Sequence, residues 1–251
     1  LNKIRILYSN SGLFELAERI LRYDDRFIAQ ELIEGGSQDR YFVGGLVTPN
    51  QHDDALFIGR KLRETPIAGG TTTQCKLEWN DAVYRHFQEF VAKTGYVGLI
   101  DFEMMYDKSD SQFKLIEINP RIGAWHLVSK TANQDIIYYH YLLLNGLPVE
   151  NYSPQQEGKI FLRLHAHYCS LVDEYGFFRS VATVASDLKK ASVIAGINLS
   201  TPRLAYRYFR VMLGCTINRL HGLPFVIFGS CFGGRSRFCS AGKNLLDFHY
   251  Y

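Results

Sequence analysis

The chain has 251 residues, 47% of them hydrophobic, and it carries 28 Lys and Arg against 25 Asp and Glu. This is an ordinary composition with enough apolar residues for a core, and a formal charge of +3 is too small to indicate nucleic acid or an anionic membrane as partner. No apolar run approaches the roughly 20 residues of a membrane span, and no signal peptide is evident. The five cysteines lack a metal-ligand spacing, which favours reduced thiols in a cytoplasmic protein.

The first residues predict a strand, a helix and a second strand. Residues 1–9 are strand-like, and residues 12–22 place Leu13, Leu16 and Ile20 on one helical face. Residues 27–36 predict another strand, which runs into a Gly-Gly turn. Because the sequence begins at Leu1 in the middle of this pattern, we expect a fragment that lacks its original N-terminus.

A basic segment follows two strands that we expect to pair, residues 41–47 and 55–61. Lys61 and Arg63 precede a loop of glycine and threonine at residues 69–73. Glycine lets the backbone approach a ligand closely, and amides with hydroxyls can bind oxyanions. This is not the P-loop motif, because no Gly-Lys-Ser/Thr follows. The segment is predicted to bind oxyanions, and the alternative is a solvated basic turn.

Residues 98–121 predict an antiparallel hairpin that turns at residues 108–111, after an amphipathic helix over residues 80–93. Residues two apart in a strand share a face, so Asp101 lies beside Glu103, and Glu117 beside Asn119 and Arg121. A hairpin with this turn makes Glu103 and Glu117 neighbours. Two carboxylates and an amide oxygen suit a hard divalent cation, and the arginine suits anionic oxygens. The alternative is a solvated strand face.

The second half of the chain is less informative. Helices are expected over residues 122–130, 136–144, 186–195 and 202–213, and a strand over residues 159–168 that places His165 and His167 on one face. Trp125 and His126 are predicted to face a substrate, with packing as the alternative for Trp125, and residues 138–141 are predicted to form aromatic core. The last helix carries three arginines on one side, a face that is either solvated or meets a partner: Arg203, Arg207 and Arg210.

The sequence IEINPR at residues 116–121, preceded by DFE at residues 101–103, resembles the metal-binding end of the ATP-grasp superfamily. The pattern extends over roughly the first 150 residues and is similar to carboxylate–amine ligases of the D-aspartate ligase and carbamoyl-phosphate-synthetase type. The resemblance implies an α+β fold, the C-terminal part of an ATP-grasp fold with an antiparallel sheet flanked by helices. It further implies a remnant of the lid subdomain and hinge (residues 1–34), a metal- and phosphate-binding subdomain (35–150) and a small mixed C-terminal extension of uncertain fold (151–251).

The same resemblance implies a role for each candidate residue. The metal ligands for Mg²⁺ or Mn²⁺ would be Glu103, Glu117 and Asn119, with Asp101 as an alternative ligand. The catalytic residues, which neutralise charge on the transferring phosphoryl oxygens, would be Arg121, Lys61 and Arg63. The ATP contacts would come from the first strand, the hinge and a residue for the ribose: Lys3, Glu31, Leu32, Ile33 and Asp39, with Gln38 as the alternative to Asp39.

The function implied is an ATP- and Mg²⁺-dependent ligase that joins a carboxylate to an amine through an acyl-phosphate. Two alternatives stay open: a non-catalytic or truncated nucleotide-binding module, and a kinase-like ATP-dependent phosphotransferase. The expected partners are small-molecule carboxylate and amine substrates, with no nucleic acid and no membrane span, and a homo-oligomer is left open. The expected location is the cytoplasm. The sequence does not name either substrate.

Overall fold

The computed structural model describes residues 7, 12–22, 28–49, 55–66, 70–148, 154–195 and 202–220. The chain divides into two compact units. The larger unit spans Glu34–Phe225, and the smaller one contains Leu1–Ile33 with Val226–Tyr251. In the smaller unit the described helix is α1 (Leu13–Leu21), as predicted, and it has no buried residue. Lys3 and the rest of the strand predicted over residues 1–9, apart from Leu7, lie outside the described residues.

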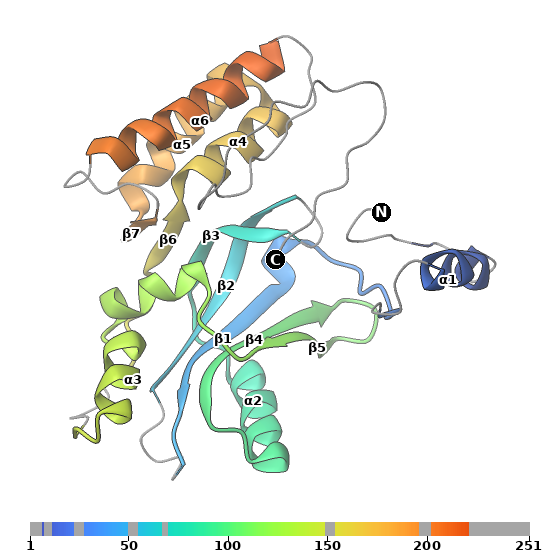
Figure 1. The fold of residues 1–251 in the computed structure, drawn as a ribbon, viewed down its shortest axis with the longest axis vertical. Coiled ribbons are helices and arrows are strands. Elements are labelled where there is room, and N and C mark those ends of the chain that lie inside the picture. Colours follow the sequence, from blue (N-terminus) through green and yellow to red (C-terminus); the bar gives the residue numbers. More distant parts are fainter. Residues whose placement is uncertain are drawn as a thin grey trace. The chain divides into compact units, whose positions relative to one another are not determined.

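The larger unit is built on a seven-stranded sheet in the order β5-β4-β1-β2-β3-β6-β7 (Figure 1). All neighbouring strands are antiparallel except β6 and β7, which are parallel. The strands are β1 (Arg40–Val47), β2 (Ala55–Thr65), β3 (Thr71–Leu77), β4 (Gly98–Asp107), β5 (Gln112–Asn119), β6 (Ile160–Arg163) and β7 (Val193–Ala195). The predicted pairing of β1 with β2 and the predicted hairpin of β4 and β5 are both confirmed.

One face of the sheet packs against α2 (Asp81–Thr94), which forms where predicted. Asn80 caps the helix, because its side chain accepts hydrogen bonds from the backbone N–H groups of Ala82 and Val83. Gly95 ends it with a φ of +63°, a conformation that glycine adopts without strain. The helix buries Val83, Phe87 and Val91 against apolar side chains of β1, β2 and β4.

The opposite face is covered by a 3-10 helix, η3 (Ala124–Ala132), and by α3 (Ile136–Leu144). Trp125, Val128 and Ile136 pack there against Phe42 and Phe57 of the sheet. The predicted helix at residues 122–130 therefore begins two residues later and winds more tightly. The prediction of aromatic core at residues 138–141 is wrong for both ends of that run, because Tyr138 and Tyr141 are 53% and 57% exposed.

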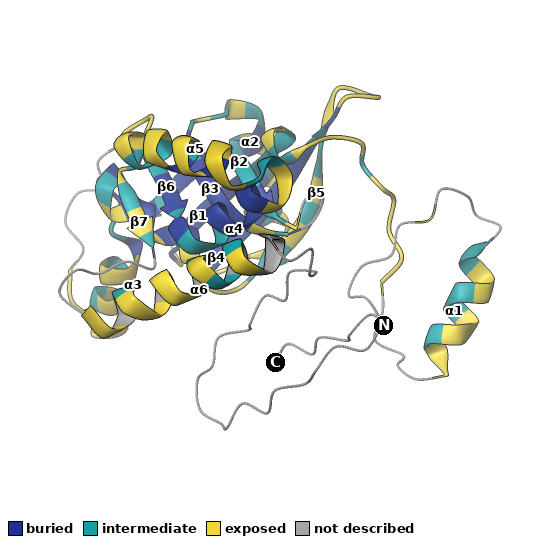
Figure 2. Cartoon of the chain, turned by 90° about the horizontal axis from the view of Figure 1, so that it is seen from above, coloured by how far each residue is buried: buried dark blue, intermediate teal, exposed yellow. Residues whose placement is uncertain are grey.

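Three helices gather at the β6–β7 end of the sheet: α4 (Leu164–Tyr175), α5 (Phe177–Lys190) and α6 (Pro202–Leu220) (Figure 1). α4 contacts both α5 and α6, and together they form an apolar cluster with Leu162 of β6. Figure 2 shows that the buried residues lie mostly in the strands and that the outer sides of these helices are exposed. No helix among the described residues is long and apolar enough to cross a membrane.

Three predicted elements are corrected by the structure. Residues 28–36 do not form a strand, since Ile28 and Leu32 are 88% and 51% exposed and no described strand pairs with them. The strand predicted over residues 159–168 ends at Arg163, where α4 begins, so His165 and His167 lie on a helix. The helix predicted over residues 186–195 is the end of α5 followed by β7. The predicted α+β class, with a mostly antiparallel sheet flanked by helices, is confirmed.

Candidate functional site

The β4–β5 hairpin brings the predicted carboxylates and amide together. Glu103 lies directly opposite Glu117 in the register, and Asp101 lies directly opposite Asn119. Directly opposed residues of an antiparallel pair project to the same face of the sheet. A bulge between Glu103 and Met104 follows this pair and shifts the register toward the turn. The four polar side chains therefore occupy one patch on the face that η3 covers.

Glu103 is the centre of a buried ion-pair network. Its Oε1 accepts a hydrogen bond from Lys61 Nζ at 2.8 Å and a second from Arg40 Nη1 at 3.4 Å. Arg40 also reaches Glu64 Oε2 at 3.3 Å, and Lys61 Nζ lies 3.7 Å from that same oxygen. The side chains of Lys61, Glu103 and Glu64 are 5%, 8% and 1% exposed. The network brings β1, β2 and β4 together beneath the patch, and it places a lysine ammonium next to the candidate metal ligands.

Glu117, Asn119 and Arg121 form a hydrogen-bonded row at the exposed end of β5. Asn119 Nδ2 donates to Glu117 Oε1 at 3.0 Å, and Arg121 Nη2 donates to Asn119 Oδ1 at 3.2 Å. Glu117 and Arg121 are exposed, and Asn119 is half-buried. This end of the patch is therefore accessible to a ligand, and its guanidinium lies beside the carboxylate and amide as the sequence predicts.

Asp101 lies deeper in the same patch. Its side chain is buried, Oδ2 accepts a hydrogen bond from Trp125 Nε1 at 3.4 Å, and the buried Oδ1 has no hydrogen-bond partner. Burial raises the pKa of Asp101 to about 7, and the neighbouring negative charge of Glu103 adds to this increase. A buried carboxylate oxygen without a partner is costly, and a cation or a hydrogen-bond donor at Oδ1 would offset that cost.

His126 does not face a substrate, because its side chain is fully buried. Its Nδ1 accepts a hydrogen bond from the Gly123 N–H at 2.9 Å, so Nε2 carries the proton and donates to the Ile100 carbonyl at 3.2 Å. Burial lowers the pKa of His126 to about 4. The ring therefore ties the turn after Arg121 to strand β4. Trp125 is buried as well and packs on Phe42 with ring centroids 3.6 Å apart.

The depressed pKa of His126 predicts a pH-dependent stability. The unfolded imidazole, with a pKa of about 6.5, takes up a proton as the pH falls below that value, whereas the folded ring stays neutral down to about pH 4. Stability that is present above pH 6.5 is therefore lost on acidification, by about 2 kcal/mol at pH 5. Asp101 acts in the opposite direction, because its raised pKa makes the folded state bind protons more tightly.

The measurement is a pair of urea titrations at pH 7 and pH 5 on the chain and on His126→Gln. Glutamine can accept from Gly123 and donate to Ile100 without titrating. The chain should lose about 2 kcal/mol more than the variant between the two pH values, since the contribution of Asp101 is common to both. Equal losses would show that the buried ring is not neutral in the folded state.

Three other predicted residues lie elsewhere in the fold. Arg63 contacts α4, where its guanidinium pairs with the carboxylate of Glu174 and donates to the hydroxyl of Tyr175 at 3.3 Å. A bulge in β2 separates Arg63 from Lys61. The side chain of Lys61 therefore contacts Glu103 of β4, whereas that of Arg63 contacts Glu174 of α4. Asp39, in the short 3-10 helix η2 (Ser37–Asp39), accepts from Lys108 Nζ at 2.7 Å at the hairpin turn. The roles predicted for Arg63 and Asp39 stay predictions.

The residues predicted to form the hinge belong to the smaller unit. Glu31 and Leu32 are exposed and Ile33 is half-buried, all in extended backbone outside any strand. Their predicted contacts with ATP, like that of Lys3, stay predictions.

Sequence reasoning missed Arg40 and Glu64. Arg40 opens β1 and meets Glu103 because β1 pairs with β4, more than 60 residues away along the chain. No local signal indicates that pairing. Glu64 carried a weaker signal, since it follows Lys61 by three residues in a basic segment, and a buried acid between cations is typical of an ion-pair network.

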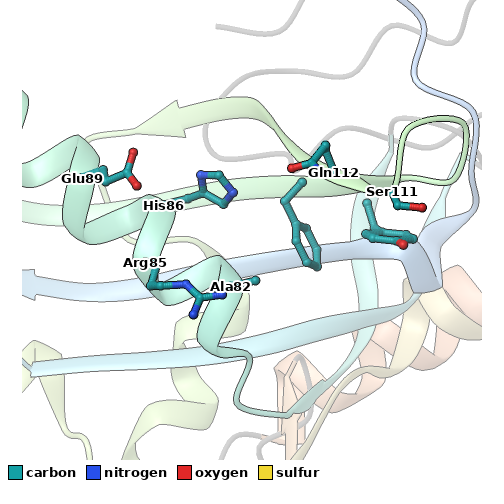
Figure 3. Close-up of a pocket in the computed structure, with 8 residues that line it drawn as sticks. Ala82, Arg85, His86, Glu89, Ser111 and Gln112 are labelled. Atoms are coloured by element: carbon teal, nitrogen blue, oxygen red, sulfur yellow. The ribbon is translucent and has the colours of Figure 1, made fainter.

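A separate pocket of about 290 Å³ lies on the α2 side of the hairpin (Figure 3). It is lined from α2 by Arg85, His86 and Glu89, and from the hairpin by Tyr106, Gln112 and other residues of the turn. None of the predicted site residues lines it. The patch around Glu103 is on the opposite face of the sheet.

The cysteines differ partly from expectation. Cys75 is a buried free thiol, as predicted, whereas Cys169 of α4 is disulfide-bonded. The prediction of reduced thiols is therefore wrong for Cys169. Spacing along the sequence does not indicate which thiols the fold brings within bonding distance.

A comparison with curated proteins agrees with the resemblance stated from the sequence. No family model matches the chain. A D-aspartate ligase of Enterococcus faecium (strain Aus0004) is 29% identical over 103 residues, which are 40% of this chain and 24% of that protein. The chain thus spans about a quarter of the length of this curated relative. The predicted resemblance to carboxylate–amine ligases of the D-aspartate ligase type is confirmed.

Two of the solved structures that align with the chain do so over more than half of it, with TM-scores below 0.5. The pyruvate carboxylase of Rhizobium etli has a TM-score of 0.47 at 16% identity, covering 62% of this chain and 15% of that one. The N5-carboxyaminoimidazole synthetase of Staphylococcus aureus, complexed with ADP, has a TM-score of 0.43 at 13% identity, covering 58% of this chain and 40% of that one.

Proposed function

We propose that this chain carries the metal- and phosphate-binding part of an ATP-dependent ligase that joins a carboxylate to an amine through an acyl-phosphate. The observation that carries the proposal is the register of the hairpin, which sets Glu103 opposite Glu117 and Asp101 opposite Asn119 on one face. The match to D-aspartate ligase supports it. We further propose that the two substrates are small molecules, one with a carboxylate and the other with an amine.

The donor set fits a divalent cation of the Mg²⁺ or Mn²⁺ type. Glu103, Glu117 and Asn119 supply hard oxygen ligands, and the unpartnered Oδ1 of Asp101 makes that residue an alternative ligand. In the described part of the chain no three His, Cys, Asp or Glu side chains converge as a metal cluster, and the proposed set combines two carboxylates with the amide oxygen of Asn119. A bound cation would neutralise charge on phosphate oxygens.

The chain's own residues have the complementary task of holding the transferring phosphoryl group. Lys61 presents an ammonium at the buried end of the patch, and Arg121 presents a guanidinium at its exposed end. Phosphoryl transfer needs mainly positioning and charge neutralisation from a protein, and two cations at opposite ends of one patch can provide both. Arg63 would have to leave Glu174 to join them.

The test is calorimetric titration of the chain with a non-hydrolysable ATP analogue, with and without Mg²⁺. We expect binding that requires Mg²⁺ and that weakens roughly 10–100-fold in Glu117→Gln, which removes a ligand charge without changing shape. The matched control is Glu89→Gln, an exposed carboxylate on α2 outside the patch. Equal affinity in chain and variant, or binding indifferent to Mg²⁺, would contradict the metal assignment. Release of ADP and phosphate that depends on an added amine would identify a ligase, whereas a stable phosphorylated product would identify a phosphotransferase.

A further inference from the structure

The outer face of α6 carries an exposed apolar stripe. Tyr206, Phe209, Leu213 and Ile217 are 61%, 62%, 48% and 45% exposed. Their spacing of three or four residues places them on one face of the helix. The adjoining side of the helix faces α4, because Met212 packs in the cluster with α4 and the Thr216 hydroxyl lies 2.5 Å from that of Tyr168. Figure 2 shows the exposed length of α6. The helix is therefore held by its inner face while the stripe lies at the surface.

Three arginines run along one flank of this stripe. Arg203, Arg207 and Arg210 are exposed, and their spacing of four and three residues aligns them on the flank away from Met212 and Thr216. The helix contains no Asp or Glu. The apolar stripe is thus bordered by three positive charges, and no acid of the same helix neutralises them.

The sequence around α6 has the same character. Residues 188–246 contain nine Lys or Arg and no Asp or Glu, whereas the whole chain has nearly equal numbers of the two kinds. A net charge of +3 for the chain conceals this separation of charge along its length. A basic tract with apolar side chains fits an anionic surface that also has an apolar layer.

We propose that the outer face of α6 docks on an anionic lipid surface, with the stripe at the acyl boundary and the arginines on headgroup phosphates. The two rows lie side by side along the helix, as an orientation parallel to a membrane plane requires. A second copy of the chain fits less well, because two such faces would bring six arginines together without an acid. Nucleic acid fits less well too, since Leu213 and Ile217 offer no ring for base stacking. The proposal is independent of the ligase assignment.

The test is co-sedimentation of the whole chain with vesicles of phosphatidylcholine alone and with a third of phosphatidylglycerol. We expect binding to the anionic vesicles only, weakened by salt. The pair Phe209→Ser and Leu213→Ser should weaken binding about tenfold or more, because exposed apolar area is lost. Its control is Phe178→Ser with Val181→Ser on α5, which removes similarly exposed apolar residues and should leave binding unchanged.

A second pair of variants tests the charge. Changing Arg203, Arg207 and Arg210 to glutamine should weaken binding roughly a hundredfold. The control removes three exposed charges elsewhere, Arg85, Lys93 and Lys130, and should have a much smaller effect. Equal binding to both kinds of vesicle, or equal loss in variants and controls, would overturn the proposal. So would a dimer in light scattering that Phe209→Ser dissociates, or tight binding of a single-stranded oligonucleotide that needs the arginines but not the stripe.

Discussion

Replacing Lys61 with methionine is expected to lower the free energy of unfolding by about 3–5 kcal/mol. The ammonium lies 2.8 Å from Glu103 and 3.7 Å from Glu64, and both carboxylates are buried. Methionine fills a similar volume but leaves Arg40 as the cation shared by the two acids. Removing one partner of a buried ion pair is costly because the remaining charge stays out of water without compensation. The substitution should also disturb the proposed metal site, because Lys61 holds Glu103, which is a proposed metal ligand.

The measurement is urea unfolding at pH 7, followed by circular dichroism, with Lys76→Met as the matched control. Lys76 is on the neighbouring strand, its side chain is 39% exposed, and it pairs with Glu78 at 3.4 Å. An exposed pair of this kind contributes less than about 1 kcal/mol. In the double variant Lys61→Met with Glu103→Leu, part of the lost stability should return, because the uncompensated carboxylate is gone. Similar small losses at Lys61 and Lys76 would mean that water reaches the network.

The features that the sequence predicts correctly are those that depend on neighbours along the chain. The β4–β5 hairpin is joined by a short polar turn, so its register follows from alternation within about 20 residues. The helix α2 is bounded by its own capping residues, Asn80 and Gly95. For the same reason the opposition of Glu103 and Glu117 could be anticipated. The metal-binding role of these residues stays a prediction.

The features that the sequence misses depend on contacts between distant segments. Arg40 lies at the site because β1 pairs with β4. Arg63 lies away from it because its side chain contacts Glu174, more than 100 residues later in the chain. Residues 28–36 are predicted as a strand that runs into a Gly-Gly turn, yet pairing partners decide whether a strand forms. At Arg163 the chain changes from strand to helix although the alternation continues through His165 and His167. Tertiary packing of α4 overrides the local pattern there.

The close packing of Trp125 on the sheet depends on Gly44 of β1, which lies opposite Asp101 in the register. A Cβ atom at Gly44 would come within 2.5 Å of Trp125 Cη2, 2.7 Å of Phe57 Cζ and 3.0 Å of His126 Nε2. Gly44→Val is therefore expected to destabilise the fold by about 3 kcal/mol, because a well-packed core does not accept the added volume. The indole would also be displaced from Asp101, its hydrogen-bond acceptor.

Gly36→Ala is the control, since nothing lies within 4 Å of a Cβ at that position and its φ of −111° suits any residue. Its effect should stay within about 0.5 kcal/mol. A double-mutant cycle with Trp125→Ala then identifies the obstructing side chain. Truncating the indole costs stability by itself, but it opens space beside Gly44, so Gly44→Val should cost at least about 1 kcal/mol less in that background. Strict additivity of the two changes would contradict this prediction. It would show that Phe57 or His126, and not Trp125, excludes a side chain at Gly44.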